Sequence, residues 1–223
     1  MSSLFKADLH IHTTYSKDSL INIDELVNYS IKIGLSAIAI TDHNEIKGAI
    51  KALRKYRNEN RIIIIPGVEL DVKNGHLLAY NILKLPPTER LNRMSIPEVI
   101  DYIHAEGGIA SIAHPLDPFR PFKNFKLILN LIDAIEIANA SDLLIYRNYK
   151  RLHKTIHSYE IGFTAGSDAH ILDAVGITFL YTTDNLETID DIIEYILKRK
   201  FNVYVRRTPF LIRLKKIILK YLL

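Results

Sequence analysis

The residues of this chain best suited to chemistry are histidines and carboxylates that follow apolar, β-branched runs. Six of the nine histidines take part in this pattern, which begins at Asp8-Leu9-His10-Ile11-His12 and ends at Ser167-Asp168-Ala169-His170. In an extended strand, residues two apart point to the same face, so His10 and His12 can converge on one ion. Histidine is the commonest metal ligand and carboxylates bridge ions, so the pattern indicates a site for several metal ions.

The elements that must position these side chains alternate between two patterns of apolar residues. Runs rich in β-branched residues predict strands at 4–11, 36–41, 61–70, 108–113, 134–138, 162–165 and 176–182, with a short extra strand at 76–82. Helical spacing predicts helices at 23–33, 46–57, 96–106, 122–132, 145–159 and 186–197. Seven strands that alternate with helices predict an α/β fold of parallel βα units.

Polar residues that suit metal binding or catalysis fall at or just after the ends of these strands. They are His10, His12, Asp42, His43, Glu69, His114, Glu136, Asn139, Asp168 and His170. In a parallel barrel, the carboxyl ends of the strands converge on one mouth, where barrel enzymes place their chemistry. The sequence therefore predicts that these distant residues form one site. His104, His153 and His157 fall within helical patterns instead, and we expect them to be ordinary packed or surface residues.

The composition describes a globular protein of one domain. At 223 residues, with 48% hydrophobic and 24% charged residues, the chain has the length of a single (β/α) barrel. It has no cysteine, so any metal site must use nitrogen and oxygen ligands. It has neither an apolar run of 18 residues nor a signal-peptide pattern, so we expect no transmembrane segment and a cytoplasmic location.

The positive net charge of +4 comes from the carboxyl-terminal tail. From Tyr195 onward there are nine basic residues and no acidic ones, whereas the rest of the chain has 20 basic and 25 acidic residues. Residues 206–223 predict a basic amphipathic helix, whose apolar stripe is formed by Phe210, Leu214, Ile217, Ile218 and Tyr221. We expect the stripe to pack on the barrel. The alternatives are a contact within a homo-oligomer, a face that attracts nucleic acid, and a membrane-surface helix.

Seven motifs, in order over residues 7–170, closely resemble those of the PHP (polymerase and histidinol phosphatase) superfamily. They are DLHIHTTYSKDS, AIAITDHN, PGVEL, GHLLAY, ASIAHP, AIEIAN and TAGSDAH. The resemblance implies a distorted (β/α)7 TIM-like barrel that forms a single PHP domain over residues 1–223, with the basic helix at 206–223 within it. It also implies a trinuclear centre of divalent metal ions (zinc, manganese or iron) that hydrolyses phosphoesters.

The resemblance assigns ligands to each of the three ions. The first ion would be held by His10, His12, Glu69 and Asp168, and the second by Asp18, His43 and His170. Glu69 would bridge to the third ion, which His76 and His114 complete. Many members of the superfamily place an acidic residue directly after the serine of the first motif, whereas here Lys17 follows Ser16 and the acid is Asp18. Other members tolerate a ligand six residues after the second histidine, which is the place of Asp18.

Further residues are predicted to act beside the ligands. A hydroxide that bridges the ions would attack phosphorus, and the candidate catalytic residues are Asp168, His170 and Glu69. Arg120 and Arg147 are candidates to bind the substrate phosphate, because arginine suits bidentate phosphate recognition. Candidates to orient ligands or substrate are Asp42, Glu136, Asn139 and Asn148. For Asp42, a helix N-cap is the alternative.

Three functions are compatible with these patterns. The first is a phosphoesterase that hydrolyses a phosphomonoester of a small metabolite or nucleotide. The second is an exonuclease or RNase that acts on oligonucleotide ends and has single-stranded nucleic acid as its partner. The third is a non-catalytic PHP partner of a nucleic-acid machine. The part of the chain that carries the histidines is net acidic and shows little interleaving of aromatic and basic residues, which favours the small phosphorylated substrate.

Overall fold

Strands and helices alternate through most of the computed structural model, which describes residues 4–221 except the side chains of Lys220 and Tyr221. The strands are β1 (Phe5–Ile11), β2 (Ala37–Ile40), β3 (Ile63–Val72), β4 (Gly75–Tyr80), β5 (Ile109–Ile112), β6 (Ala134–Asn139), β7 (Gly162–Gly166), β8 (Phe179–Thr182) and β9 (Asn202–Tyr204). The helices are α1 (Ile23–Lys32), α2 (Lys47–Lys55), α3 (Thr88–Leu91), α4 (Ile96–Ala105), α5 (Ile145–Tyr159), α6 (Ile189–Leu197) and α7 (Phe210–Tyr221). Two short 3₁₀ turns are η1 (Phe125–Ile128) and η2 (Leu172–Ala174).

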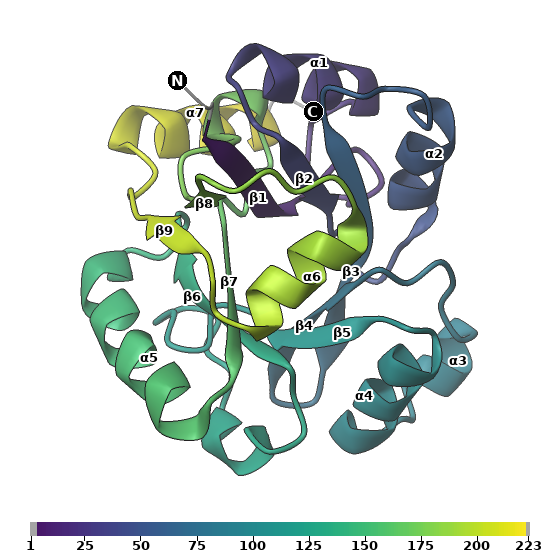
Figure 1. Ribbon diagram of the computed structural model, residues 1–223, viewed down its shortest axis with the longest axis vertical. Coiled ribbons are helices and arrows are strands. Elements are labelled where there is room, and N and C mark those ends of the chain that lie inside the picture. The colour runs from purple at the N-terminus through teal and green to yellow at the C-terminus, as the bar shows by residue number, and fades with distance from the viewer. Residues whose placement is uncertain (1–3, 222–223) are drawn as a thin grey trace.

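The strands form one mixed sheet in the order β7-β6-β5-β4-β3-β2-β1-β8-β9. The sheet closes where Ile11, at the end of β1, pairs in parallel with Ala169, just beyond β7. Backbone hydrogen bonds from His12 N to Ala169 O (2.9 Å) and from Asp168 N to His10 O (2.8 Å) hold this seam. Helices α1, α2, α4 and α5 lie around the strands (Figure 1). The result is the nearly closed, distorted barrel that the sequence predicts.

Two antiparallel strands depart from the predicted pattern of parallel units. Strand β4, predicted only as a short extra strand, occupies a place in the barrel wall between β3 and β5 and is antiparallel to both. The predicted strand at 176–182 is β8, which pairs antiparallel with β1 outside the seam. The reason for the first reversal is local. Only Lys73 and Asn74 separate β3 from β4, and so short a connection permits only an antiparallel pair.

Local capping signals set several helix boundaries. Asn22 Oδ1 accepts a hydrogen bond from Asp24 N at 2.9 Å at the start of α1. Thr188 and Asp191 form a reciprocal capping box at the start of α6, with bonds of 3.1 and 2.9 Å. The prediction of a helix at 122–132 is wrong, because only the short turn η1 forms there. Asn124 adopts a left-handed φ of 56° directly before this turn, which interrupts helical geometry.

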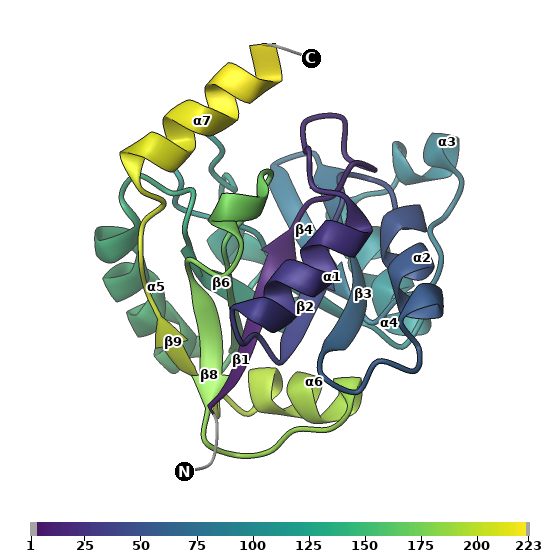
Figure 2. The ribbon, with the colours of Figure 1, turned by 90° about the horizontal axis from the view of Figure 1, so that it is seen from above.

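Helix α7 lies across the end of the barrel toward which β1 runs, opposite α6 (Figure 2). It begins at Phe210, four residues later than predicted, and residues 222–223 of the predicted helix lie outside the described part. The side chain of Tyr221 also lies outside the described part. Of the predicted apolar stripe, Phe210 is 75% exposed and Ile218 is 48% exposed, while Ile217 lines a cavity beside the barrel. Ile212 and Leu219 pack on the body instead, so the predicted orientation is wrong. No helix within residues 4–221 has the length and apolar character to cross a bilayer.

Candidate metal centre

The side chains predicted as ligands meet at one end of the barrel, where they are supplied by six different strands or by the residues that follow them. The ligand cluster comprises His10, His12, His43, Glu69, His76, His114, Asp168 and His170, with Asp18 at its edge. Most of these side chains are buried, and the strand order places their backbones around the mouth. Residues 160 positions apart in the chain are thereby neighbours.

Glu69 is the fully buried centre of the ligand cluster. Its Oε2 atom lies 3.0 Å from His10 Nε2 and 3.1 Å from His12 Nε2. Its Oε1 atom lies 2.8 Å from His76 Nδ1 and 3.0 Å from His114 Nε2. The two carboxylate oxygens therefore face two separate pairs of histidines. Each pair, together with Glu69, forms a group of atoms close enough to bind one ion.

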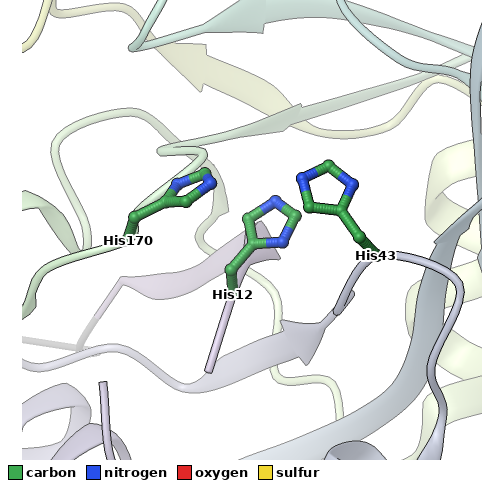
Figure 3. Close-up of side chains that lie close together, drawn as sticks. All are labelled: His12, His43 and His170. Atoms are coloured by element: carbon green, nitrogen blue, oxygen red, sulfur yellow. The ribbon is translucent and has the colours of Figure 1, made fainter. Parts of the chain in front are cut away.

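A third group consists of His12, His43 and His170, whose rings turn toward one another in Figure 3. The centre of the His12 ring is 4.3 Å from that of His170 and 4.5 Å from that of His43. Asp18 Oδ2 is 3.0 Å from His170 Nε2 and 4.0 Å from His43 Nε2. Asp18 thus reaches the edge of this group, which also includes His12, a residue that the resemblance assigned to the first ion alone.

The imidazoles of His10 and His12 are oriented by acceptors outside the cluster. His10 Nδ1 is 2.9 Å from Glu136 Oε1, and a carboxylate can only accept, so this nitrogen carries the hydrogen. His12 Nδ1 is 3.2 Å from Ser16 Oγ, whose own hydrogen goes to Asp42 Oδ1 at 2.9 Å. Both Nε2 lone pairs consequently point into the cluster. Ser16 was not predicted to orient a ligand, and its place in the first motif was the only signal.

Backbone carbonyls orient two further histidines in the same way. His114 Nδ1 lies 3.0 Å from Arg120 O, and His170 Nδ1 lies 2.9 Å from Asp168 O. Because a carbonyl oxygen only accepts, each Nδ1 donates and each Nε2 keeps its lone pair. Asp168 (φ 52°) and His114 (φ 28°) also adopt left-handed backbone conformations that are rare outside glycine and gather at functional sites.

These donors fit divalent cations. The Nε2 atoms of His10 and His12 are 3.1 Å apart, and both face Glu69 Oε2, so their lone pairs repel unless a positive charge lies among them. Asp168 Oδ1 is buried 3.3 Å from His12 Nε2, and within residues 4–221 it has no hydrogen-bond partner. Imidazole nitrogens and carboxylate oxygens without sulfur suit zinc, manganese or iron.

The electrostatics of the cluster also call for positive charge. Burial alone would raise the pKa of Glu69, but the histidines around it, His10 above all, hold its pKa well below the usual value. Burial opposes ionisation of Asp168 too, but Arg120 and His10 keep the pKa of Asp168 well below its usual value. Burial lowers the pKa of His43 to about 4, so His43 is a neutral ligand near pH 7. Despite burial, Glu136 and Glu69 hold the pKa of His10 well above its usual value. Two ionised carboxylates therefore share a dry site that favours positive charge.

The two arginines predicted to bind phosphate lie in different places. Arg120 Nη2 is 2.7 Å from Asp168 Oδ2, and Arg120 lines a cavity beside the cluster. Asp117 Oδ2 lies 3.6 Å from the same nitrogen and helps to hold the guanidinium. Arg147 is exposed on α5, outside the described residues that line this cavity. The structure therefore brings Arg120, but not Arg147, to the ligand cluster.

Glu136 and Asn139, on β6, contact the ligands as the sequence suggested. Besides accepting from His10, Glu136 accepts through Oε2 from His114 N (2.8 Å) and from Asn139 Nδ2 (3.0 Å). The same Asn139 amide is 3.4 Å from Asp168 Oδ2. One carboxylate thus fixes one ligand through its ring and another through its backbone.

Asp42 and Asn148 have different surroundings. Asp42 accepts from Thr13 N (2.6 Å), Thr13 Oγ1 (2.7 Å) and Ser16 Oγ, and α2 begins only at Lys47, so Asp42 does not cap that helix. Asn148 Nδ2 donates to Asp142 Oδ2 (2.7 Å) and to a backbone carbonyl after β5 (2.8 Å). These bonds join the loops after β5 and β6 and do not reach a candidate ligand, so for Asn148 a role in orienting the substrate stays a prediction.

Asp8 and Gly166 support the seam beneath the cluster and were not predicted to do so. Asp8 is fully buried and accepts from Ser167 N (2.9 Å) and Gly176 N (2.8 Å), which ties the first motif to the last. A Cβ atom at Gly166 would lie 2.6 Å from His10 N, so only glycine lets β7 approach β1 so closely. Their signal in the sequence was their place inside the first and last motifs.

Fold and site together define a barrel protein that gathers candidate metal ligands at the ends of its strands. A family model described as "PHP domain" matches residues 8–203. The chain belongs to the PHP domain family. A protein of Methanocaldococcus jannaschii is 29% identical over 145 residues, which are 60% of this chain and 82% of that protein.

Two solved structures show the same fold at low sequence identity. One is a two-domain protein from Bacteroides vulgatus that contains a predicted PHP-like metal-dependent phosphoesterase; its TM-score is 0.71 at 16% identity, covering 91% of this chain. The chain spans 65% of that protein. The other is PsfC from Pseudomonas syringae, with a TM-score of 0.70 at 18% identity over 98% of each chain.

Proposed function

We propose that this protein is a metal-dependent hydrolase that cleaves a phosphomonoester of a small metabolite or nucleotide. The observation that carries the proposal is the convergence of oriented Nε2 lone pairs on Glu69 and Asp168, beside the guanidinium of Arg120. Such a site concentrates divalent cations and offers a fixed positive charge, and a phosphate dianion binds where both are present. Membership of the PHP family supports the same chemistry.

The three groups of ligand atoms support three ions that share Glu69 and His12. The first would be held by His10, His12, Glu69 and Asp168, the second by His12, His43, His170 and Asp18, and the third by Glu69, His76 and His114. Bound divalent ions lower the pKa of water and neutralise the phosphoryl and leaving oxygens.

The chain's own residues bind the phosphate and move protons. Arg120 lines the cavity beside the cluster, and its N–H groups are placed to bind phosphoryl oxygens. Asp168 Oδ1, buried without a hydrogen-bond partner among the described residues, is placed to orient the attacking water. Its low pKa suits it to accept a hydrogen bond from that water while remaining ionised. His170, also predicted to be catalytic, lies 3.0 Å from Asp18, which is partly exposed and would connect the site to solvent for proton transfer.

The test is to replace His12 or Asp168 by alanine. Metal content and turnover should fall together, with turnover reduced at least about 100-fold, because the ions supply several kcal/mol of transition-state stabilisation. Metal content is measured by mass spectrometry, and turnover with AMP, a 3′,5′-bisphosphonucleoside, histidinol phosphate and short RNA, each with manganese and with zinc. His104→Ala, on the exposed side of α4, is the control. Full activity of either variant, or cleavage of none of the monoesters, would contradict the proposal.

A second candidate is an exonuclease or RNase, and a basic cavity beside α2 favours it. Lys47, Lys51, Arg54 and Tyr15 line a cavity of about 990 Å³, and Asn44, next to the ligand His43, lines it too. Lys51 Nζ lies 5.9 Å from the centre of the Tyr15 ring. Basic side chains with an aromatic ring are typical of surfaces that follow a single strand.

The salt dependence of RNA binding distinguishes the two functions. For a nuclease, the affinity for a short single-stranded RNA should fall steeply with salt, by a log–log slope of roughly 0.7 for each phosphate neutralised. The double variant Lys51→Ala/Arg54→Ala should then reduce the slope by about 1 to 2. An RNA affinity that does not change with salt would exclude the second candidate and leave the small substrate.

A further inference from the structure

One cavity joins the ligand cluster to helix α7. It has a volume of about 300 Å³ and is lined on one side by Arg120, Asp168 and His170 of the metal centre. On the other side it is lined by Ile212 and Ile217 of α7. Figure 2 shows α7 above the same end of the barrel. A group attached to a phosphate at the metal centre would therefore enter this cavity.

The wall that α7 provides is fixed to the barrel by polar contacts. The guanidinium of Arg213 donates to three backbone carbonyls, those of Ala140 (3.0 Å), Ser141 (2.9 Å) and Thr208 (3.0 Å). Thr208 N also donates to Ala140 O at 2.9 Å, and Lys215 pairs with Asp173. These contacts hold the first two turns of α7 against the loops that follow β6 and β7.

The opposite wall is a loop held by one buried carboxylate. Asp117 is 3% exposed, and its Oδ1 accepts from Phe119 N at 2.7 Å and from Arg120 N at 3.3 Å. This arrangement presents the Phe119 ring, which is 75% exposed, to the cavity. The loop thereby places an aromatic ring and a phosphate-binding guanidinium next to each other.

The surface between these walls exposes more apolar than polar area, although Lys216 lines it beside the two arginines. Phe119, Ile171, Ala174, Ile212 and Ile217 line the cavity, and Phe119 and Ile217 are both more than half exposed. The guanidinium groups that line it have partners in the protein, Arg120 in Asp168 and Arg213 in the carbonyls. A ring that entered would bury apolar surface on both sides, which is favourable in proportion to the area removed from water. Aromatic rings also pack favourably against phenylalanine.

We propose that this cavity binds the leaving group of the substrate, and that the leaving group carries a single apolar ring system. The volume of about 300 Å³ lies at the lower limit of ordinary ligand pockets, which suits one ring system and not an extended chain. Helix α7 is then a determinant of specificity. This inference rests on the proposed phosphomonoesterase function, because it assumes a phosphate bound at the metal centre.

Two non-hydrolysable probes test the cavity without depending on turnover. Phenylphosphonate and methylphosphonate carry the same anionic group and differ in the apolar part. Calorimetric titration of the manganese-loaded protein should show phenylphosphonate binding at least about tenfold more tightly, the scale expected when an apolar group fills a pocket. The same preference should appear in turnover: kcat/KM should be higher for phenyl phosphate than for glycerol 3-phosphate.

Neighbouring residues of α7 provide a matched pair of variants. Ile217 lines the cavity and Ile218 does not, although they are 53% and 48% exposed. Ile217→Trp should fill the cavity and reduce the preference for the phenyl compounds at least about fivefold, with methylphosphonate binding unchanged. Ile218→Trp should keep the wild-type preference. Because both positions are largely exposed, neither variant threatens folding.

The outcomes separate the two proposals. Wild-type protein that binds both phosphonates without preferring the phenyl group, or equal effects of the two tryptophan variants, would overturn the inference about the leaving group alone. Wild-type protein that binds neither phosphonate and cleaves no phosphomonoester would overturn the proposed function and this inference with it.

Discussion

The ligand cluster and helix α7 face each other across one cavity, but they are held in place in opposite ways. Glu69 is fully buried; its Oε2 atom contacts His10 and His12 at the end of β1, and its Oε1 atom contacts His76 on β4 and His114 after β5. Helix α7 is held by Arg213 and by two apolar side chains, and its outward residues, such as Phe210, are exposed. The pairing of the sheet therefore fixes the reactive groups, whereas a few side-chain contacts fix the wall that faces the substrate.

The largest effect should follow from a change at the centre of the cluster. Glu69→Gln removes the charge that faces four histidines, so we expect metal content to collapse and turnover to fall by about 1,000-fold. Metal analysis and a chromogenic phosphoester assay measure the two effects. Glu106→Gln, at a surface carboxylate that pairs with Lys84, is the control and should behave as wild type. Normal metal content in Glu69→Gln would show that the buried cluster is not the metal site.

The pH dependence of stability should reveal the buried carboxylate beneath the cluster. Burial raises the pKa of Asp8 to about 6, from 3.8 in the unfolded chain, although hydrogen bonds from Ser167 and Gly176 oppose the shift. Between about pH 4 and pH 6 the native state keeps a proton that the unfolded state has lost. The free energy of unfolding should therefore fall by about 3 kcal/mol as the pH rises through this window.

Urea denaturation of the chelator-treated protein at several pH values measures this contribution. Asp8→Asn does not titrate, so its curve should lack this fall, while other groups affect both proteins alike. The variant should be less stable throughout, because its amide cannot accept from both Ser167 N and Gly176 N as the carboxylate does. Equal slopes for the two proteins would mean that Asp8 does not stay protonated in the fold.

A smaller effect is expected from the carboxylate that orients the ligands. Glu136→Gln places an amide where Oε1 and Oε2 accept from His10, His114 N and Asn139. Loss of such an orienting carboxylate typically weakens metal binding about 10- to 100-fold, and we expect a loss within that range. Competition with a fluorescent chelator measures the affinity. An unchanged affinity would indicate that sheet pairing alone positions His10.

The smallest effect should come from the attachment of α7. Arg213→Ala removes hydrogen bonds to three carbonyls, so the helix should detach more often and trypsin should cut at Arg206 or Arg207 about tenfold faster. Metal content should not change. Lys215→Ala removes only an exposed ion pair and should change the cleavage rate less than about threefold. Equal effects of the two variants would mean that the guanidinium does not anchor the helix.

A homo-oligomer formed through α7 stays a prediction, and the exposed apolar residues of this helix are the reason for it. Phe210, Leu211, Leu214 and Ile218 are each at least 40% exposed, so several large apolar side chains of one helix face solvent. The same helix carries Arg213, Lys215 and Lys216 and has no acidic residue.

Much of the barrel could be predicted because its signals are local. β-branched runs identified β1, β2, β3, β5, β6 and β7, and capping residues set helix starts such as Asn22 before α1. The antiparallel places of β4 and β8 could not be predicted from apolar runs, because periodicity does not record the direction in which a strand pairs. The helix expected at 122–132 failed where Asn124 takes a left-handed conformation.

The site, like the fold, was predictable where its signals are local and unpredictable where they depend on tertiary contacts. The candidate ligands could be chosen from the sequence because they stand at the ends of strands and in motifs that resemble those of a known family. Arg120 and Arg147 could not be distinguished in the sequence, and only the folded loop brings Arg120 to Asp168. The orienting role of Ser16 was missed because it depends on contacts with His12 and Asp42, which come from two different strand ends.

By itself, the sequence determined that this chain forms a barrel with histidines and carboxylates at its mouth, because strand periodicity and motif order are properties of neighbouring residues. Only the tertiary structure decided that Glu69 stands between two pairs of histidines and that His12 belongs to two groups of ligands. It also decided how α7 is held at the cavity, since the Arg213 guanidinium donates to the carbonyls of Ser141 and Ala140, which are distant in the chain. Such contacts join residues far apart in the chain, and their geometry exists only after the sheet has closed.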